Sequence, residues 1–370
     1  MRHNILVFLV LWCTFWLPAL AQDMSTEVLT GAESMAQYLP MLQGKRVGLV
    51  VNQTAVVHRQ GDGAYIPLPD TLLSRGVDVR CIMAPEHGYK GIAEAGAHVG
   101  NSRDAATGLS IYSLYGDDKK PRREWLDALD VVVFDIQDVG CRFYTYLSTL
   151  YYVMQACSEQ HKDLIILDRP NPNDTVDGPT LQPKFESFVG IIPIPLMHGC
   201  TLGELARIMA EKGWLNEKPQ PDLGEPSLRY TIIPCLHWRH GQPYSLPIAP
   251  SKNLQNDHAI ALYPSLCLFE GSDVAASLRS KYPFEMYGKH DLRAVEAPRG
   301  FSLQFYLQHQ QERGWGWITR PKFFNLLAGS DLLYNQLKAG WSEARIRQSW
   351  QPELEEFRRL RAQYAIYEIL

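Results

Sequence analysis

The stretch from Leu129 to Tyr146 constrains the fold more strongly than any other part of the chain. It begins with β-branched and aromatic residues at 131–134, which are typical of a strand buried on both faces. From residue 147, apolar side chains recur at intervals of three and four, which predicts a helix. Between the two elements lie Asp135, Gln137, Asp138, Arg142 and Tyr144. In open parallel α/β sheets ligands bind where strands end, so this polar cluster predicts a ligand site.

The same order of apolar strand and polar end recurs along the chain. Further strands are predicted at 45–51, 78–83 and 164–167, with helical patterns between them, for example at 68–75 and 122–129. The polar residues that follow these three strands include Asn52, Gln53, Glu86, His87, Arg169 and Asn171. Alternating strands and helices predict a parallel sheet with right-handed crossovers, in which the strand ends share one edge. Four polar strand ends on one edge predict a hydrogen-bonding cleft for a sugar or a similar ligand.

Length and charge set the broad class of the protein. The chain has 370 residues, of which 46% are hydrophobic, and a formal charge of −4. This length suggests two domains, and a segment rich in Pro, His and Gly near 238–250 marks the expected boundary. We therefore expect domains at 22–245 and 246–370, the end of the second being helical. A charge this close to neutral, without a basic stripe, argues against nucleic acid as a partner.

Residues 1–21 have the pattern of a secretory signal peptide. Arg2 and His3 precede an apolar run, and small residues at 19–21 offer a cleavage site before Gln22. An exported protein, periplasmic or secreted, is therefore expected, with an uncleaved membrane anchor as the alternative. No later segment approaches the roughly 20 apolar residues of a spanning helix, so no stable membrane insertion is expected after cleavage.

Several chemistries lack their sequence signatures. The chain contains no GxGxxG after a strand, no GxxxxGK[ST], no GxSxG and no HExxH, and its histidines are dispersed in sequence. No cofactor and no metal is therefore predicted, with a mononuclear catalytic metal as the alternative. Six cysteines follow the signal segment without a CxxC pair, and most are expected to be small buried apolar residues. The T-x-x-E spacing of Thr201 and Glu204 predicts a helix-capping box more strongly than a catalytic role for Glu204.

Carboxylates are the remaining candidates for catalysis. Glycosidic cleavage needs one carboxyl group to protonate the leaving oxygen and a second to activate water or attack carbon. Glu86 suits the proton donor, because it follows a strand end and precedes a turn glycine, although it could instead brace the loop. The candidates for the second group are Asp135, Asp138, Asp168 and Asp177.

Each of these groups also has a structural interpretation. Asp138 and Asp168 lie near Arg142 and Arg169 in sequence, so structural ion pairs are an alternative for both, while Asp177 could serve a turn. The two arginines could instead hold a substrate carboxylate through paired hydrogen bonds. The neighbouring tyrosines, Tyr144 and Tyr146, could stack on a sugar or pack in the core.

The same segments carry a family likeness. The chain resembles the NamZ-type exo-β-N-acetylmuramidase family over most of its length after the signal segment. The matching motifs are GKRVGLVVNQTAV at 44–56, APEHGYKG at 84–91, TGLSIYSLYG at 107–116, FDIQDVGCRFYTYLST at 134–149, LDRPNP at 167–172, VDGPTL at 176–181, SFVGIIPIPLMHGCTLGELA at 187–206 and LYPSLCLFEGS at 262–272. Their collinear order makes a chance match implausible.

The resemblance implies an α/β fold: a Rossmann-like parallel-sheet N-terminal domain with a smaller α+β C-terminal domain and a cleft between them. It implies hydrolysis of terminal non-reducing N-acetylmuramic acid from peptidoglycan fragments. Glu86 falls on the family's PEHG glutamate and is the expected catalytic acid. The resemblance does not decide the second carboxylate; Asp177 is selected because it lies in a matching motif without an obvious ion-pair partner. The expected substrate-binding residues are Asn52, Gln53, His87, Gln137, Asp138, Arg142, Tyr144, Arg169, Asn171, His198 and Asn253.

The chain departs from the family pattern at two places. A GRGT-like run is replaced by Ser277 to Ser280, where the arginine comes one position late, and the usual SPN reads SKN at 251–253. If that arginine loop holds the lactyl carboxylate, substrate choice or activity would change. The alternatives are therefore a non-catalytic muropeptide- or glycan-binding protein on the same scaffold, and an esterase or amidase acting on the same polymer.

Overall fold

The computed structural model describes residues 27–59, 61 and 63–369. The predicted signal peptide at 1–21 lies outside this range. None of the helices within it combines the length and the apolar character needed to cross a membrane.

A seven-stranded sheet forms the centre of the N-terminal region. Its strand order is β11-β8-β7-β1-β4-β6-β5, and every pairing is parallel except that of β5 with β6. The strands are β1 (Arg46–Val51), β4 (Asp78–Ala84), β5 (Ser102–Arg103), β6 (Ser110–Ser113), β7 (Val131–Asp135), β8 (Asp163–Leu167) and β11 (Arg229–Ile233). The predicted parallel α/β sheet is confirmed, and the four predicted strands lie side by side as β8, β7, β1 and β4.

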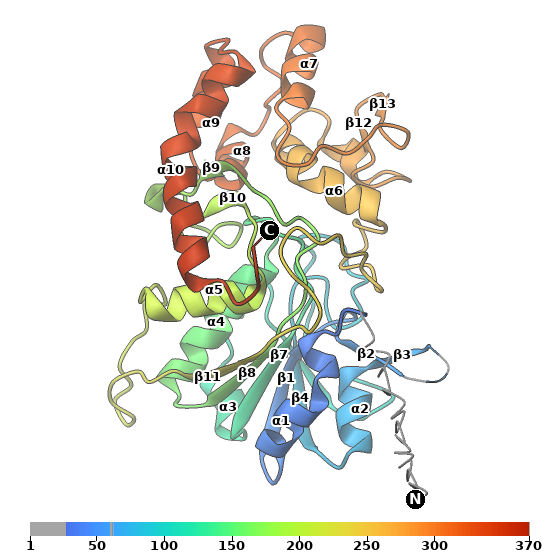
Figure 1. Cartoon of the computed structure of the whole chain (residues 1–370), viewed down its shortest axis with the longest axis vertical. Coiled ribbons are helices and arrows are strands. Elements are labelled where there is room, and N and C mark those ends of the chain that lie inside the picture. Colours follow the sequence, from blue (N-terminus) through green and yellow to red (C-terminus); the bar gives the residue numbers. More distant parts are fainter. Residues whose placement is uncertain (1–26, 60, 62, 370) are drawn as a thin grey trace, which may run out of the picture.

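Helices cover both faces of this sheet (Figure 1). One face packs against α1 (Met35–Leu42) and α2 (Leu68–Ser74) through side chains such as Leu49 and Val133. The other packs against α3 (Arg123–Asp127), α4 (Tyr146–Glu159) and α5 (Leu202–Glu211). Because both faces are buried, the central strands are apolar throughout rather than alternating. At the start of α5, Thr201 and Glu204 form the predicted capping box.

The region after residue 246 is mainly helical (Figure 1). Its helices are α6 (Asp257–Leu266), α7 (Gln304–Arg313), α8 (Pro321–Ala328), α9 (Leu332–Lys338) and α10 (Glu343–Tyr364). A hairpin of β12 (Met286–Tyr287) and β13 (His290–Asp291) and the 3₁₀ turns η3 (Cys267–Gly271) and η4 (Ala275–Arg279) complete it. The smaller C-terminal part is thus helical with a minor β component.

Two small antiparallel sheets and two 3₁₀ turns remain. They are β2 (Val56–His58) with β3 (Tyr65–Pro67), β9 (Val176–Thr180) with β10 (Pro195–His198), η1 (Gly31–Glu33) and η2 (Pro183–Phe185). β10 pairs with β9 outside the main sheet. β9 in turn packs against α10, the last helix. A segment that precedes the predicted domain boundary thus contacts one that follows it. The boundary itself stays a prediction.

All six cysteines of the described chain are buried and unpaired, as expected.

Candidate active site

A cavity of about 490 Å³ lies between the strand-end loops and the C-terminal helical region. Its wall combines the loops after β4 and β6, the start of α4, the segment 251–254, and parts of α6, η3, η4 and α8. The polar and charged side chains in the wall are Glu86, His87, Tyr115, Lys119, Tyr144, Thr145, Ser251, Asn253, Tyr263, Glu270 and Arg279. The volume is within the range of ordinary small-molecule sites.

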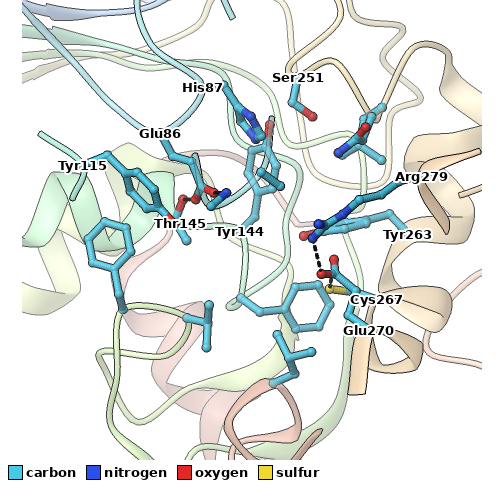
Figure 2. Close-up of a pocket in the computed structure, with 18 of the residues that line it drawn as sticks. Glu86, His87, Tyr115, Tyr144, Thr145, Ser251, Tyr263, Cys267, Glu270 and Arg279 are labelled. Carbon is cyan, nitrogen blue, oxygen red and sulfur yellow. Dashed lines mark hydrogen bonds and ion pairs between the residues drawn. The ribbon is translucent and has the colours of Figure 1, made fainter. Parts of the chain in front are cut away.

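Glu86 is held rigidly by a tight turn at the end of β4. His87 has a φ of 69° and Gly88 one of 74°, so two successive residues adopt the left-handed conformation, which is uncommon for a residue with a side chain. The His87 ring is fixed in turn by a 2.8 Å contact between Nδ1 and the Ala93 carbonyl oxygen. This turn directs the Glu86 carboxylate into the cavity wall (Figure 2).

Two donors bind the Glu86 carboxylate, one at each oxygen. The Gly96 amide donates to Oε1 at 2.9 Å, and the Thr145 hydroxyl donates to Oε2 at 2.6 Å. Thr145 directly precedes α4, so the strand-end loop of β7 reaches the carboxylate that follows β4. Glu86 is only 7% exposed, and the two hydrogen bonds account for its burial as a polar group.

Tyr115, from the loop after β6, stands next to Glu86 (Figure 2). Burial, and then the charge of Glu86, raise the pKa of Tyr115 to about 12, so its phenol stays protonated at neutral pH. The nearby Lys119 ammonium lies 5.1 Å from the centre of the Phe188 ring. The loop after β6 therefore adds a neutral donor and a cation to the cavity.

Glu270 is the second carboxylate of the cavity, and Figure 2 shows it across the cavity from Glu86. The Arg279 guanidinium donates to Glu270 Oε2 at 2.7 Å. Burial is the main cause that raises the pKa of Glu270; Arg279 counteracts it, and the charge of Glu86 adds to it. Glycoside hydrolysis uses a pair of carboxyl groups, and Glu86 and Glu270 line the same cavity.

Aromatic rings form another part of the wall. Tyr263 contacts Phe143 at 5.3 Å and Phe284 at 4.8 Å between ring centres, and both contacts are edge-to-face. Tyr144 packs edge-to-face against Tyr263 as well. A wall that combines aromatic rings with acids and cations suits a ligand with apolar and polar faces, such as a sugar ring.

Four of the residues predicted from the sequence line this cavity. They are Glu86, His87, Tyr144 and Asn253. Asn253 belongs to the SKN segment, whose Ser251 also lies in the wall. The arginine of the unusual 277–280 run, Arg279, enters the cavity at the end of η4.

The amide side chains predicted to bind substrate form hydrogen bonds within and between loops. Asn52 accepts hydrogen bonds from both the amide and the hydroxyl of Thr54. Gln53 donates to the carbonyls of residues 249 and 250, next to the cavity segment. Gln137 donates to the carbonyls of residues 138 and 170, and Asn171 donates to that of residue 200. These amides tie neighbouring loops together and are not part of the cavity wall.

Asp138, His198 and Arg169 are buried and are absent from the cavity wall. Asp138 accepts from the Gly140 amide at 2.7 Å and lies 3.5 Å from His198 Nε2. Arg169 pairs with Asp135, its Nη2 lying 2.9 Å from Oδ2. The sequence suggested an ion pair between the neighbours Asp168 and Arg169. Arg169 instead pairs with Asp135, which lies at the end of the adjacent strand β7.

Arg142 is fully buried and has no acidic partner among the residues that the structure describes. It donates to the carbonyls of Pro179, Ile194 and Leu327, each at 2.9 Å. Burial lowers the pKa of Arg142 to about 9. Its guanidinium thus joins β9, the segment before β10 and α8 from within the core.

Asp177 lies in β9 and faces α10. Its carboxylate accepts from the amides of Gly178 and Phe301 and lies 3.2 Å from Arg347 Nη1. It is absent from the cavity wall. The structure therefore does not bring Asp177 together with Glu86.

Sequence reasoning singled out the loop that carries Arg279 but missed four residues of the wall as site residues: Tyr115, Lys119, Thr145 and Glu270. Thr145 and Glu270 each lie in a motif that resembles the family, so the signal for them was present. Glu270 lies 184 residues after Glu86 in the chain and follows no strand of the sheet, which is why strand-end reasoning did not select it.

Comparison with known proteins decides the family. The model of the N-terminal region of the exo-β-N-acetylmuramidase NamZ matches residues 47–258, and the model of its C-terminal region matches residues 299–367. The chain belongs to the NamZ family.

A curated relative supports the assignment to the NamZ family. The peptidoglycan β-N-acetylmuramidase NamZ of Bacillus subtilis (strain 168) is 36% identical over 279 residues. The alignment covers 73% of this chain and 63% of the relative, so it spans less than two thirds of that protein.

Two solved structures from Bacteroides fragilis NCTC 9343, both of DUF1343 family proteins, share the NamZ-family fold of this chain. Their TM-scores are 0.80 and 0.77, with sequence identities of 33% and 25%. The matches cover 93% and 92% of this chain and 100% and 99% of the solved chains.

Proposed function

We propose that this protein is an exo-acting glycoside hydrolase that releases terminal non-reducing N-acetylmuramic acid from peptidoglycan fragments. Membership of the NamZ family supports the reaction class, and the activity of the Bacillus subtilis relative, a peptidoglycan β-N-acetylmuramidase, supports the substrate. The observation that carries the proposal is the pair of acids, Glu86 and Glu270, in the wall of one cavity.

Glu86 is the proton donor in this proposal. Its carboxyl group is held in one orientation by Gly96 and Thr145, which removes the need to order it during the reaction. In its protonated form, with the Thr145 hydroxyl accepting from it instead of donating, such a fixed group can protonate the oxygen of the leaving sugar as the glycosidic bond breaks. Tyr115, which stays a neutral phenol, adds a hydrogen-bond donor beside it.

Glu270 is the second carboxylate, in preference to Asp177. Glu270 shares the cavity with Glu86, whereas Asp177 is bound by Arg347 and two backbone amides outside it. Glu270 acts in its ionised form, either on a water molecule or on the anomeric carbon. Arg279 favours that form by lowering the pKa of Glu270 against the effect of burial.

Recognition of the sugar uses the rest of the wall. Arg279 and Lys119 are the cations available to the lactyl carboxylate, and an arginine can bind a carboxylate through two parallel hydrogen bonds. His87 and Asn253 supply polar atoms, while Tyr144 and Tyr263 offer aromatic surface to the sugar ring. The altered 277–280 run thus retains a cation in the cavity.

A chromogenic β-N-acetylmuramide tests the proposal. The unmodified protein should release the chromophore. Glu86→Gln and Glu270→Gln should each lower the rate by a factor of about 10²–10⁴, the usual contribution of a positioned acid or base. Asp177→Asn is the matched control and should retain most of the activity. Loss with Asp177→Asn but not with Glu270→Gln would reject the assignment of Glu270.

A muropeptide-binding protein without activity is the second candidate. The observation that favours it is the Arg279–Glu270 ion pair, which engages the second carboxylate. Calorimetric binding of N-acetylmuramic acid, together with no release from the chromogenic substrate, would select this function. Release of acyl groups or peptide instead of sugar would select an esterase or amidase.

The proposal also includes export. The pattern of residues 1–21 supports cleavage before Gln22 and a periplasmic or secreted protein, where peptidoglycan fragments are present. Mass spectrometry of the protein recovered from the periplasm or medium should find Gln22 at the N-terminus. An intact N-terminus in a membrane fraction would reject cleavage.

A further inference from the structure

Three side chains of metal-ligating type meet in the C-terminal region, away from the cavity. One ligand atom from each of His290, His309 and Glu312 lies within 4.8 Å of the other two. His309 and Glu312 are three residues apart on α7 and so share one face of that helix. His290 comes from β13, and Figure 1 shows the β12–β13 hairpin near α7. Histidines that are dispersed in sequence are thus brought together by the fold.

His309 is buried beside a carboxylate and has one ring nitrogen without a partner among the described residues. It is only 4% exposed, and its Nε2 lies 3.1 Å from Asp273 Oδ1. Its other ring nitrogen, Nδ1, is buried and has no hydrogen-bond partner in the described chain. Metal-bound histidines usually direct their second nitrogen to a carboxylate, which fixes the tautomer and the ring. Asp273 fits that orienting role and leaves the Nδ1 lone pair available.

Glu312 and His290 are already in contact. Glu312 Oε2 lies 2.9 Å from His290 Nε2, while Oε1 accepts a hydrogen bond from Gln308 at 3.1 Å. The bond from Gln308 lowers the pKa of Glu312, so the carboxylate is ionised at neutral pH. The His290 ring is held by stacking on Tyr287 at 4.5 Å. Lys289 approaches the same oxygen at 3.8 Å, but its side chain is 80% exposed and free to move into solvent.

We propose that His290, His309 and Glu312 bind a divalent transition-metal ion of the zinc type. Two imidazoles and one carboxylate match the nitrogen and oxygen ligands that zinc accepts, and water would complete a four-coordinate site. Magnesium and calcium fit less well, because they prefer sites built from several oxygen ligands. The ion would replace the direct contact between His290 and Glu312.

This site would brace one wall of the cavity. The Gly288 amide, in the turn between β12 and β13, donates to Ser277 Oγ at 2.7 Å. Ser277 lies in η4, the turn that ends at Arg279. A metal ion that joins the hairpin to α7 would therefore restrain the segment that carries Arg279. The inference rests on the ligand geometry alone and does not require the proposed hydrolase function.

Calorimetry with zinc chloride tests the site. The mature protein is used without a histidine tag, after dialysis against a chelator. We expect saturable binding of one equivalent, which His290→Ala and Glu312→Gln each abolish. His98→Ala is the matched control, because His98 forms an exposed pair with Asp117, with 3.2 Å between Nε2 and Oδ2, and should leave binding unchanged. Asp273→Asn, which neutralises the orienting carboxylate and its pair with Arg313, should weaken binding by about 10–100-fold.

A second readout identifies the ligands directly. Cobalt(II) bound in place of zinc should give the visible absorption of a low-symmetry nitrogen and oxygen site, and His290→Ala should remove it. Circular dichroism of each variant establishes that it is folded, so a loss of binding is not confused with unfolding. Absence of saturable binding, or binding that folded His290→Ala and Glu312→Gln proteins retain, would overturn the proposal.

Discussion

Replacing Arg279 with methionine tests how the second carboxylate is controlled. The guanidinium donates to Glu270 Oε2 at 2.7 Å, and the two side chains are 42% and 15% exposed, respectively. A hydrogen bond to a charged group contributes about 1.5–3 kcal/mol, and the exposure of Arg279 places this one near the lower end. Since about 1.4 kcal/mol corresponds to one pKa unit, Arg279→Met should raise the pKa of Glu270 by roughly one unit.

The sign of the effect follows from the role of Glu270. Burial and the charge of Glu86 raise the pKa of Glu270, and Arg279 opposes both. Because Glu270 acts when ionised, activity appears as pH rises through its pKa. The acid limb of the kcat/KM profile reports that pKa in the free enzyme. Arg279→Met should therefore move the acid limb to higher pH by roughly one unit.

The assay is the pH dependence of kcat/KM for the chromogenic β-N-acetylmuramide. Loss of a cavity cation should also lower the plateau, but the midpoint of the acid limb is the quantity that decides. Lys119→Met is the control: it removes the ammonium that lies over the Phe188 ring and should lower the plateau without moving the midpoint. If the acid limb of Arg279→Met stays in place or moves to lower pH, Arg279 does not lower the pKa of the group that controls activity.

Three further predictions concern stability, each measured by urea denaturation. Arg142→Met should lower the free energy of unfolding by about 3 kcal/mol or more. The reason is that it leaves three buried carbonyls without a donor, and each costs about 1–3 kcal/mol. A loss below about 1 kcal/mol would contradict this prediction. Burial raises the pKa of Asp168 to about 6, so the folded state binds the proton more tightly than the unfolded state does. The free energy of unfolding should therefore fall by up to about 3 kcal/mol as pH rises from about 4 to 6. Asp168→Asn should flatten that slope, and an unchanged slope would exclude Asp168 as its source. Gly91→Ala should destabilise more than Gly76→Ala: both have positive φ, but only at Gly91 would a Cβ lie 2.2 Å from the Gln53 side chain. Equal losses would show that the Gln53 side chain yields without cost.

The central sheet was predictable because its signal is local. Runs such as 131–134 combine β-branched residues with flanking turns, and burial on both faces makes each run continuously apolar. β6 was missed, because its sequence SIYS is short and half polar, and only its pairing with β4 makes it a strand. Glu86 was found for the same local reason: it directly follows a strand that could be recognised.

The opposite wall of the cavity depends on tertiary structure. Glu270 lies in a 3₁₀ turn after α6, and no pattern in the sequence states that this turn faces Glu86. Polar residues at strand ends were expected to bind ligand, but Gln137 and Arg169 form hydrogen bonds and an ion pair between the loops themselves. Composition at a strand end does not distinguish a group that faces a cavity from one that fastens neighbouring loops.

The most direct test is a crystal structure of Glu86→Gln with a disaccharide that carries N-acetylmuramic acid at its non-reducing end. We expect the sugar to lie in the 490 Å³ cavity, with Glu270 next to the anomeric carbon. The glycosidic oxygen should lie about 2.6–3.2 Å from the side chain at position 86. A sugar bound with its glycosidic bond beside Asp177, or outside the cavity, would exclude Glu86 and Glu270 as the catalytic pair.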